Sequence, residues 1–238
     1  EIINESAQEA KIENEIAKIE LTWRDNVLSL VKYKKDGVER GVVLRPAEEL
    51  KMELEDNMLN LQTIGASRFV GIFIDKVKEW EKSLNIVSEC LEVWFQVQRK
   101  WAYLEGIFIG AEDIRLQLPE EAKRFDGIDK AFKAIMTATA KNPNVVECCT
   151  TNDRLDNLTK LGERLDSCQK SLSDYLDTKR AAFPRFFFIS DDELLSVLGS
   201  SDPTAIQIHL LKLFDNVKQF TFGRNNKIVE EMTSSEKE

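Results

Sequence analysis

The sequence predicts a mainly α protein: an elongated multi-helix bundle or rod with one long spine helix and small β-hairpin insertions. Glycine and proline are few, at 10 and 5 of 238 residues, and charged residues make up 32%. That balance is typical of helical surfaces. Large apolar residues recur in alternating steps of four and three along residues 70–108. A period of about 3.5 residues indicates a helix packed against other helices.

The spine helix is predicted over residues 70–108. Its apolar row consists of Phe73, Val77, Trp80, Leu84, Val87, Leu91 and Trp94. The next position of the row is Gln98, yet the apolar residues shift to Val97, Trp101, Leu104 and Phe108. This change predicts a stammer that overwinds the helix, and a stiff helix is favoured here over a hinge. The tryptophans at 80, 94 and 101 are predicted to be core rather than a stacking platform.

The first part of the chain is predicted to hold a helix, a hairpin and a second helix. A helix over residues 2–31 follows from one apolar face, formed by Ile12, Ile16, Ile19, Trp23, Val27 and Leu30. The turn dipeptide Asp36-Gly37 before Val42-Val43-Leu44 predicts a β-hairpin near residues 32–45. A phosphate-binding loop is disfavoured, because Gly37 and Gly41 lack its spacing and its Lys-Ser/Thr ending. Pro46 opens the helix that continues to Ile64.

The second part alternates helices with short β elements. Helices are predicted over residues 113–118, 119–141 and 152–179. The aromatic run Arg185–Ile189 predicts a buried strand near 185–189. Ser190 or Asp191 then caps a brief helix that Gly199 closes, and Asp202-Pro203 opens another with Ile206, Leu210, Leu213 and Phe214 inward. A final β-hairpin is predicted near 217–232, joined through Gly223 to Asn226. The predicted domains are 1–110 and 111–238, with one continuous elongated domain as the alternative.

Charge and cysteine content narrow the classes of partner. The net charge is −9 and the pI is about 5.0, which disfavours nucleic acid and anionic membranes as partners. No apolar run approaches the ~20 residues of a membrane span.

Cys90 and Cys168 are predicted as small apolar fillers, and Cys148-Cys149 lacks the spacer of a zinc or thioredoxin motif. This usage predicts a reducing intracellular compartment. The first residue, Glu1, without a secretory signal, suggests a piece of a longer protein.

No catalytic, cofactor-binding or metal-binding residue is predicted. His209 is the only histidine, and its apolar neighbours along the helix predict a structural role. Glu105 falls on or beside the apolar row of the spine, which predicts a buried capping or salt-bridge residue. Phosphate-loop, dinucleotide, serine-hydrolase and metalloprotease motifs do not occur in the sequence. These observations disfavour a helical-bundle enzyme.

Three long stretches of the sequence resemble the signature of a known protein family. Residues 94–108 read W-x-x-V-Q-x-x-W-x-Y-L-E-x-I-F, and Asp113-Ile114, Gln117-Leu118-Pro119-Glu120-Glu121 and Phe125 continue the pattern. Residues 179–195 read K-R-x-x-F-P-R-F-F-F-I-S-x-x-E-L-L. Together with the Asp202-Pro203 helix and the β run after it, they cover most of 45–222. Their content and order resemble dynein heavy chains, in the linker segment just before the ring of AAA+ modules.

The resemblance implies a function. In dyneins the linker is a mainly helical rod with small hairpins that bends and straightens as the first ATP site turns over. The chain is therefore expected to be a mechanical lever segment of a microtubule-motor ATPase, without catalysis of its own. ATP and magnesium are expected on the AAA+ modules, and the microtubule is expected to contact only a distant stalk.

Two further expectations concern location and the competing function. Residues 108–125 look closer to the axonemal dyneins of cilia and flagella than to cytoplasmic ones, so the expected location is the cytoskeleton of the axoneme. The alternative function is a passive helical cytoskeletal scaffold of spectrin or plakin type. The hairpins and the absence of a fixed-period repeat count against that alternative.

Overall fold

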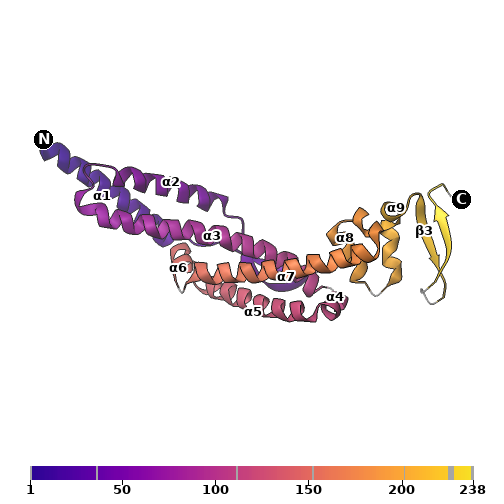
Figure 1. Ribbon diagram of the computed structural model, residues 1–238. Coiled ribbons are helices and arrows are strands. Elements are labelled where there is room, and N and C mark those ends of the chain that lie inside the picture. Colours follow the sequence, from indigo (N-terminus) through magenta and orange to yellow (C-terminus); the bar gives the residue numbers. More distant parts are fainter. Residues whose placement is uncertain are drawn as a thin grey trace. The chain divides into compact units, whose positions relative to one another are not determined.

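The computed structural model describes residues 2–35, 37–110, 112–151, 153–200, 202–224 and 228–236. Helices dominate this part of the chain, and its sheets are two antiparallel two-stranded hairpins (Figure 1). The prediction of a mainly α fold with a long spine helix and small β-hairpins is confirmed.

The chain divides into two compact units, each built from two separate segments of the sequence. Unit 1 comprises Glu1–Lys100 and Asp129–Glu163, and unit 2 comprises Trp101–Ile128 and Arg164–Glu238. These units follow proximity in space, whereas the predicted domains 1–110 and 111–238 follow sequence order. The predicted domains stay a prediction.

Unit 1 contains the N-terminal helices and the first hairpin. Its elements are α1 (Ile2–Asp25), β1 (Leu30–Lys35), β2 (Val38–Leu44), α2 (Glu48–Gly65), most of α3 (Ile74–Phe108), the end of α5 (Pro119–Lys141), α6 (Val145–Thr150) and the start of α7 (Arg154–Ala182). Helices α1 and α2 lie side by side (Figure 1). The core is formed by apolar side chains from each helix, among them Ile16, Trp23, Leu61, Leu84, Leu91, Trp94, Phe132, Val145 and Leu158.

Unit 2 contains the end of α3, the start of α5, most of α7 and the second hairpin. Its other elements are α4 (Glu112–Gln117), a 3-10 helix (Pro184–Phe188), α8 (Asp191–Leu198), a second 3-10 helix (Pro203–His209), α9 (Leu210–Leu213), β3 (Val217–Phe222) and β4 (Val229–Ser234). Its core includes Trp101, Leu104, Phe108, Ile114, Phe125, Leu165, Leu172, Leu194 and Leu210.

Helix α3 is a single α-helix of 35 residues that follows a short 3-10 turn, Gly71–Phe73. Its apolar row is buried as predicted from Val77 to Phe108, with Trp94 and Trp101 at most 1% exposed. The exception is Trp80, which was predicted to be core and is only half-buried. Beyond Trp94 the seven-residue spacing continues through Gln98 and Glu105, while Val97 and Leu104 are buried beside them. The wider buried face accounts for the change of apolar spacing, and the helix continues unbroken through it.

The first helix ends earlier than predicted, at Asp25 instead of residue 31. Leu28 donates its backbone N–H to the carbonyl of Pro143 at 2.7 Å, and Arg45 donates to Ser29 at 2.9 Å. These long-range bonds turn the chain out of the helix and into β1, and they leave Val27 59% exposed. The periodicity that continued through Val27 and Leu30 was therefore misleading.

The predicted first hairpin and the helix after it are confirmed. Strands β1 and β2 pair antiparallel, with Leu30 opposite Leu44 and Lys35 opposite Val38. Gly37 lies in the turn with φ +78°, a left-handed conformation that glycine adopts readily. Its predicted turn partner Asp36 lies outside the described residues.

The predicted strand near 185–189 is wrong, because this segment is the 3-10 helix Pro184–Phe188. Phe186 donates its N–H to the carbonyl of Phe183 at 3.0 Å, which is the i to i+3 bond of that helix. Pro184 suits the first turn, where its missing N–H costs nothing. A buried strand would cover the whole aromatic run, whereas Phe187 and Phe188 are each 67% exposed.

The remaining predictions for the second half hold with smaller changes. Asp202 caps the next helix by accepting from Thr204 N at 2.9 Å, but that helix is 3-10 up to His209 and α only over Leu210–Leu213. Strands β3 and β4 confirm the hairpin predicted near 217–232. Residues 225–227 of its predicted turn, and residue 152 at the predicted start of α7, lie outside the described residues.

Helix α6 was not predicted. It follows Asn142-Pro143-Asn144, where α5 has ended, and spans six residues. Asn144 caps it by accepting from Glu147 N at 3.0 Å and donates its amide to the carbonyl of Arg24 at 2.9 Å. One side chain thus starts α6 and satisfies the end of α1.

Candidate functional site

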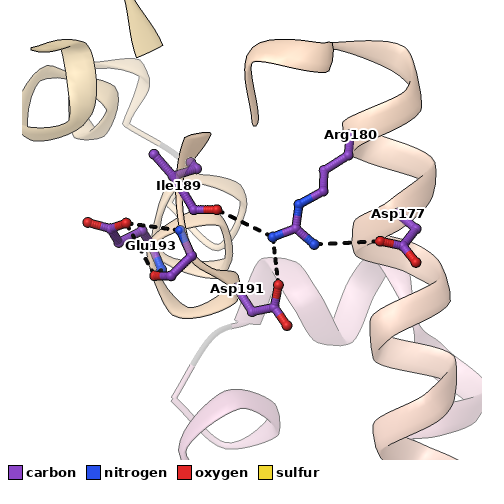
Figure 2. A network of polar contacts seen from close by, with 6 residues as sticks. Asp177, Arg180, Ile189, Asp191 and Glu193 are labelled. Atoms are coloured by element: carbon purple, nitrogen blue, oxygen red, sulfur yellow. Dashed lines mark hydrogen bonds and ion pairs between the residues drawn. The ribbon is translucent and has the colours of Figure 1, made fainter. Parts of the chain in front are cut away.

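A polar network in unit 2 connects the end of α7 to the start of α8 (Figure 2). Arg180 on α7 is nearly buried, with 11% of its side chain exposed. Its guanidinium donates to Asp191 Oδ1 at 2.6 Å and to the carbonyl of Ile189 at 3.4 Å, and lies 3.6 Å from Asp177 Oδ1. Because the planar guanidinium contacts two elements at once, it braces the junction between them.

The start of α8 is fixed by a capping box. The Ser190 hydroxyl accepts from Glu193 N at 3.3 Å, and the Glu193 carboxylate accepts from Ser190 N at 3.0 Å. Of the two predicted caps, Ser190 and Asp191, the structure selects Ser190, and Asp191 pairs with Arg180 instead. Gly199 ends the helix as predicted.

Glu193 also joins α8 to the last helices of the chain. Its Oε1 accepts a hydrogen bond from Lys212 Nζ and lies 3.5 Å from His209 Nδ1. The hydrogen bond from Lys212, followed by that from the Ser190 backbone, lowers the pKa of Glu193 to about 2. A carboxylate with so low a pKa is a poor general base near neutral pH, where the best bases have a pKa close to the working pH.

Ser190, Glu193 and His209 are the residue types of a hydrolase triad, but their order in space is wrong for one. In a triad the histidine lies between the nucleophile and the carboxylate. Here Glu193 lies between Ser190 and His209. His209 is 5% exposed, and its Nε2 has no hydrogen-bond partner among the described residues. The geometry therefore supports a bracing role, in line with the predicted structural role of His209.

The low pKa of Glu193 leads to a prediction on pH and stability. A carboxyl whose folded pKa is below its unfolded value of 4.5 stabilises the fold above pH 4.5, and this contribution is lost as pH falls toward about 2. We expect Glu193→Gln to lower the free energy of unfolding at pH 7 and to differ little from wild type near pH 2. Urea titrations of both chains between pH 2 and 7 measure this difference. A difference in the free energy of unfolding between the two chains that does not change with pH would contradict the low pKa of Glu193.

In unit 1 three cysteines lie together on α3 and α6. A hydrogen bond with Cys90, followed by burial, raises the pKa of the Cys149 thiol. Burial also raises the pKa of Cys148, whose thiol donates to the carbonyl of Asn142 at 3.0 Å. Thiols with raised pKa are poor nucleophiles. Within the described ranges no group of three or more His, Cys, Asp or Glu residues is placed to hold a metal ion.

The other residues singled out in the sequence are core residues. Cys90 and Cys168 are fully buried, as predicted for small fillers. Glu105 is also fully buried, near the end of α3, and its side chain is not without an interaction partner. The Arg154 guanidinium lies 5.4 Å from the ring centroid of Trp94 and donates to the carbonyl of Cys148 at 3.1 Å. No described helix is long and apolar enough to cross a lipid bilayer.

Sequence reasoning missed the Arg180–Asp191 pair and two glutamines, Gln98 and Gln207, whose amides bind strand backbones. For Gln98 a signal existed, because it is a polar residue at a buried row position of α3. For Arg180 and Gln207 the sequence offers no such signal, since their partners are set by the tertiary fold.

The mainly helical fold with its two small hairpins and the signature stretches lead to one class, a helical segment of a motor heavy chain. Residues 1–238 match the family described as "Dynein heavy chain, N-terminal region 2", so the chain belongs to the dynein heavy chain family. The predicted resemblance to dynein heavy chains is thereby confirmed.

Individual relatives are axonemal, flagellar or ciliary by name. The chain is 56% identical over 237 residues to the dynein-1-alpha heavy chain of the flagellar inner arm I1 complex of Chlamydomonas reinhardtii. It is 51% identical over 241 residues to dynein axonemal heavy chain 10 of Homo sapiens, and 39% identical over 243 residues to the ciliary dynein beta chain of Heliocidaris crassispina. Each match covers all of this chain and 5% of the length of the relative.

Proposed function

We propose that this chain is the linker of an axonemal dynein heavy chain, a mechanical lever that changes shape on the AAA+ ring and converts ATP hydrolysis elsewhere in the heavy chain into force. The parent protein is then a microtubule-motor ATPase of the cilium or flagellum. The segment itself carries no catalysis, and ATP and magnesium are held by the AAA+ modules. Its partner is the ring of the same heavy chain, with the microtubule contacted only through the stalk, and it binds neither nucleic acid nor membrane.

Helix α3 is the observation that carries this proposal. It continues for 35 residues, and its buried side chains extend from Val77 to Phe108. A lever must transmit force without melting, and a close-packed interior with low compressibility suits that task. The Arg180 network adds a brace between consecutive elements of unit 2.

The passive scaffold is the weaker candidate. The match to the dynein family over residues 1–238 supports the motor assignment, and so do the two hairpins, which interrupt the helical pattern. Nothing in the part of the chain that the structure describes favours the scaffold specifically.

Microtubule gliding by the complete motor tests the lever. We expect Arg180→Ala in the full heavy chain to loosen the junction of α7 and α8. Gliding velocity then falls by roughly twofold or more, while ATP hydrolysis per motor is retained, because changes in a coupling element are worth about 0.5–2 kcal/mol. Lys170→Ala, on an exposed position of the same helix, is the matched control and should glide normally. Unchanged gliding by an assembled Arg180→Ala motor would favour a passive segment.

A further inference from the structure

One glutamine amide attaches a hairpin in each unit. In unit 1, Leu44 of β2 donates its N–H to Gln98 Oε1 at 2.8 Å, and Gln98 Nε2 donates to the carbonyl of Leu44 at 2.9 Å. In unit 2, Phe220 of β3 donates to Gln207 Oε1 at 2.9 Å, and Gln207 Nε2 donates to the carbonyl of Phe220 at 2.5 Å. Each amide binds both backbone groups of a single residue, as a neighbouring strand does.

These bonds lie on the outer edges of the hairpins. In an antiparallel pair, a residue directs both backbone groups either toward its partner strand or away from it. Leu44 is opposite Leu30, and Phe220 is opposite Met232. Because the N–H and C=O of Leu44 and Phe220 go to glutamines, they point away from β1 and β4. Each glutamine therefore takes the place of a third strand.

Gln98 lies at a position of α3 where a polar side chain is expected to cost stability. It lies four residues after Trp94 in the buried row of α3 and is itself half-buried. A buried amide whose groups lack partners destabilises a fold, whereas one that bonds through both groups does not. A polar residue at such a row position is known to specify register at a cost in stability. Gln98 thus selects the one arrangement in which Leu44 lies against it.

The hairpins themselves bury little side-chain surface. In β1–β2 the buried residues are Val43 and Leu44, at the end beside Gln98. In the described residues of β3–β4 none is buried. A two-stranded hairpin with no further support is marginally stable in water. The glutamine amide is therefore a directional attachment of each hairpin, and in unit 2 it acts beside the edge contact between the rings of Phe220 and Phe214.

We propose that Gln98 and Gln207 are latches, and that the two hairpins are separately releasable modules. Both bonds of a latch come from one planar amide and end on one residue, so they form and break together. That gives each hairpin two discrete states, docked and released, without unfolding of the helices. This device is local to each unit and goes beyond the proposed lever, because it does not depend on a ring or on ATP.

Hydrogen exchange measured by mass spectrometry on the complete heavy chain tests the latches. In Gln98→Met we expect peptides covering 30–44 to exchange roughly 10- to 100-fold faster, the factor that two neutral hydrogen bonds represent. Peptides of β3–β4 should stay as in wild type. Gln207→Met should give the reverse result, with only residues 217–234 affected. Gln96→Met, at an exposed position of the same helix as Gln98, should change neither hairpin.

Gln98→Glu separates a latch from general packing. At neutral pH the carboxylate accepts from Leu44 N–H but repels its carbonyl, so exchange over 30–44 should again be faster. Below about pH 4.3 the protonated acid offers one donor and one acceptor, and its exchange should approach that of wild type at the same pH. The proposal is overturned if Gln98→Met leaves the hairpin unchanged or loosens all of unit 1 equally. Equal exchange of Gln98→Glu and wild type at neutral pH would overturn it too.

Discussion

Replacement of Trp94 by alanine is expected to lower the free energy of unfolding of unit 1 by about 3–5 kcal/mol, the usual cost of truncating a buried large aromatic residue. Trp94 is fully buried in the middle of the α3 row, and the Arg154 guanidinium lies over its ring. Truncation removes the packed ring, leaves a cavity and deprives Arg154 of its cation–π partner. Denaturant titration with hydrogen exchange as a unit-by-unit readout measures the loss, because a chain of two units need not unfold in one step.

Two variants make the Trp94 result specific. Trp80→Ala removes the same side chain from the same helix at a half-buried position, so it should cost clearly less. Trp94→Phe should also cost less, because the indole Nε1 makes no hydrogen bond within the described residues and only ring volume is lost. If Trp80→Ala were as damaging as Trp94→Ala, burial along the α3 row would not be what holds unit 1 together.

The long helices could be predicted because their information is local. The period of α3 needs only its own residues, and the row from Val77 to Phe108 is buried as the spacing indicates, apart from the half-buried Trp80. The ends of helices were also readable where a residue acts on its own backbone, as at the Ser190 cap and at Gly199. Turn chemistry likewise indicated both hairpins before any tertiary contact was known.

The wrong predictions concern segments whose backbone conformation depends on contacts with residues far away in the sequence. The helical spacing of α1 continues past Asp25, but bonds from Leu28 to Pro143 and from Arg45 to Ser29 redirect the chain. The aromatic run after Pro184 has the composition of a strand, but the sheet in the described part of unit 2 consists of β3 and β4 alone, and the run pairs with neither of them. A segment without a partner for its ladder bonds forms i to i+3 bonds with itself instead.

The polar contacts of the candidate site were the least predictable part. Arg180 and Asp191 are eleven residues apart, and the 3-10 helix Pro184–Phe188 lies between them in the sequence. Gln98 and Leu44 are 54 residues apart. Periodicity could mark Gln98 as an anomaly in an apolar row, but it could not name the strand that explains the anomaly.

The stacked pair Phe108 and Phe125 is expected to stabilise unit 2 as strongly as Trp94 stabilises unit 1. Both rings are fully buried, and their centroids lie 5.5 Å apart with planes inclined by 24°. We expect Phe125→Ala to lower the free energy of unfolding of unit 2 by about 3–5 kcal/mol. Phe188→Ala, at a position 67% exposed, is the matched control and should stay within about 0.5 kcal/mol of wild type.

A double-mutant cycle separates the stacking of this pair from its burial. If the rings interact beyond the area they bury, Phe108→Ala and Phe125→Ala together should cost about 0.5–1.5 kcal/mol less than the sum of the single changes. Additive costs would mean that each ring packs independently. The distinction matters for a lever, because coupled side chains lose their contacts together. Phe108 ends α3 and Phe125 lies near the start of α5. If the two rings are coupled, the end of α3 unfolds only when the start of α5 unfolds as well.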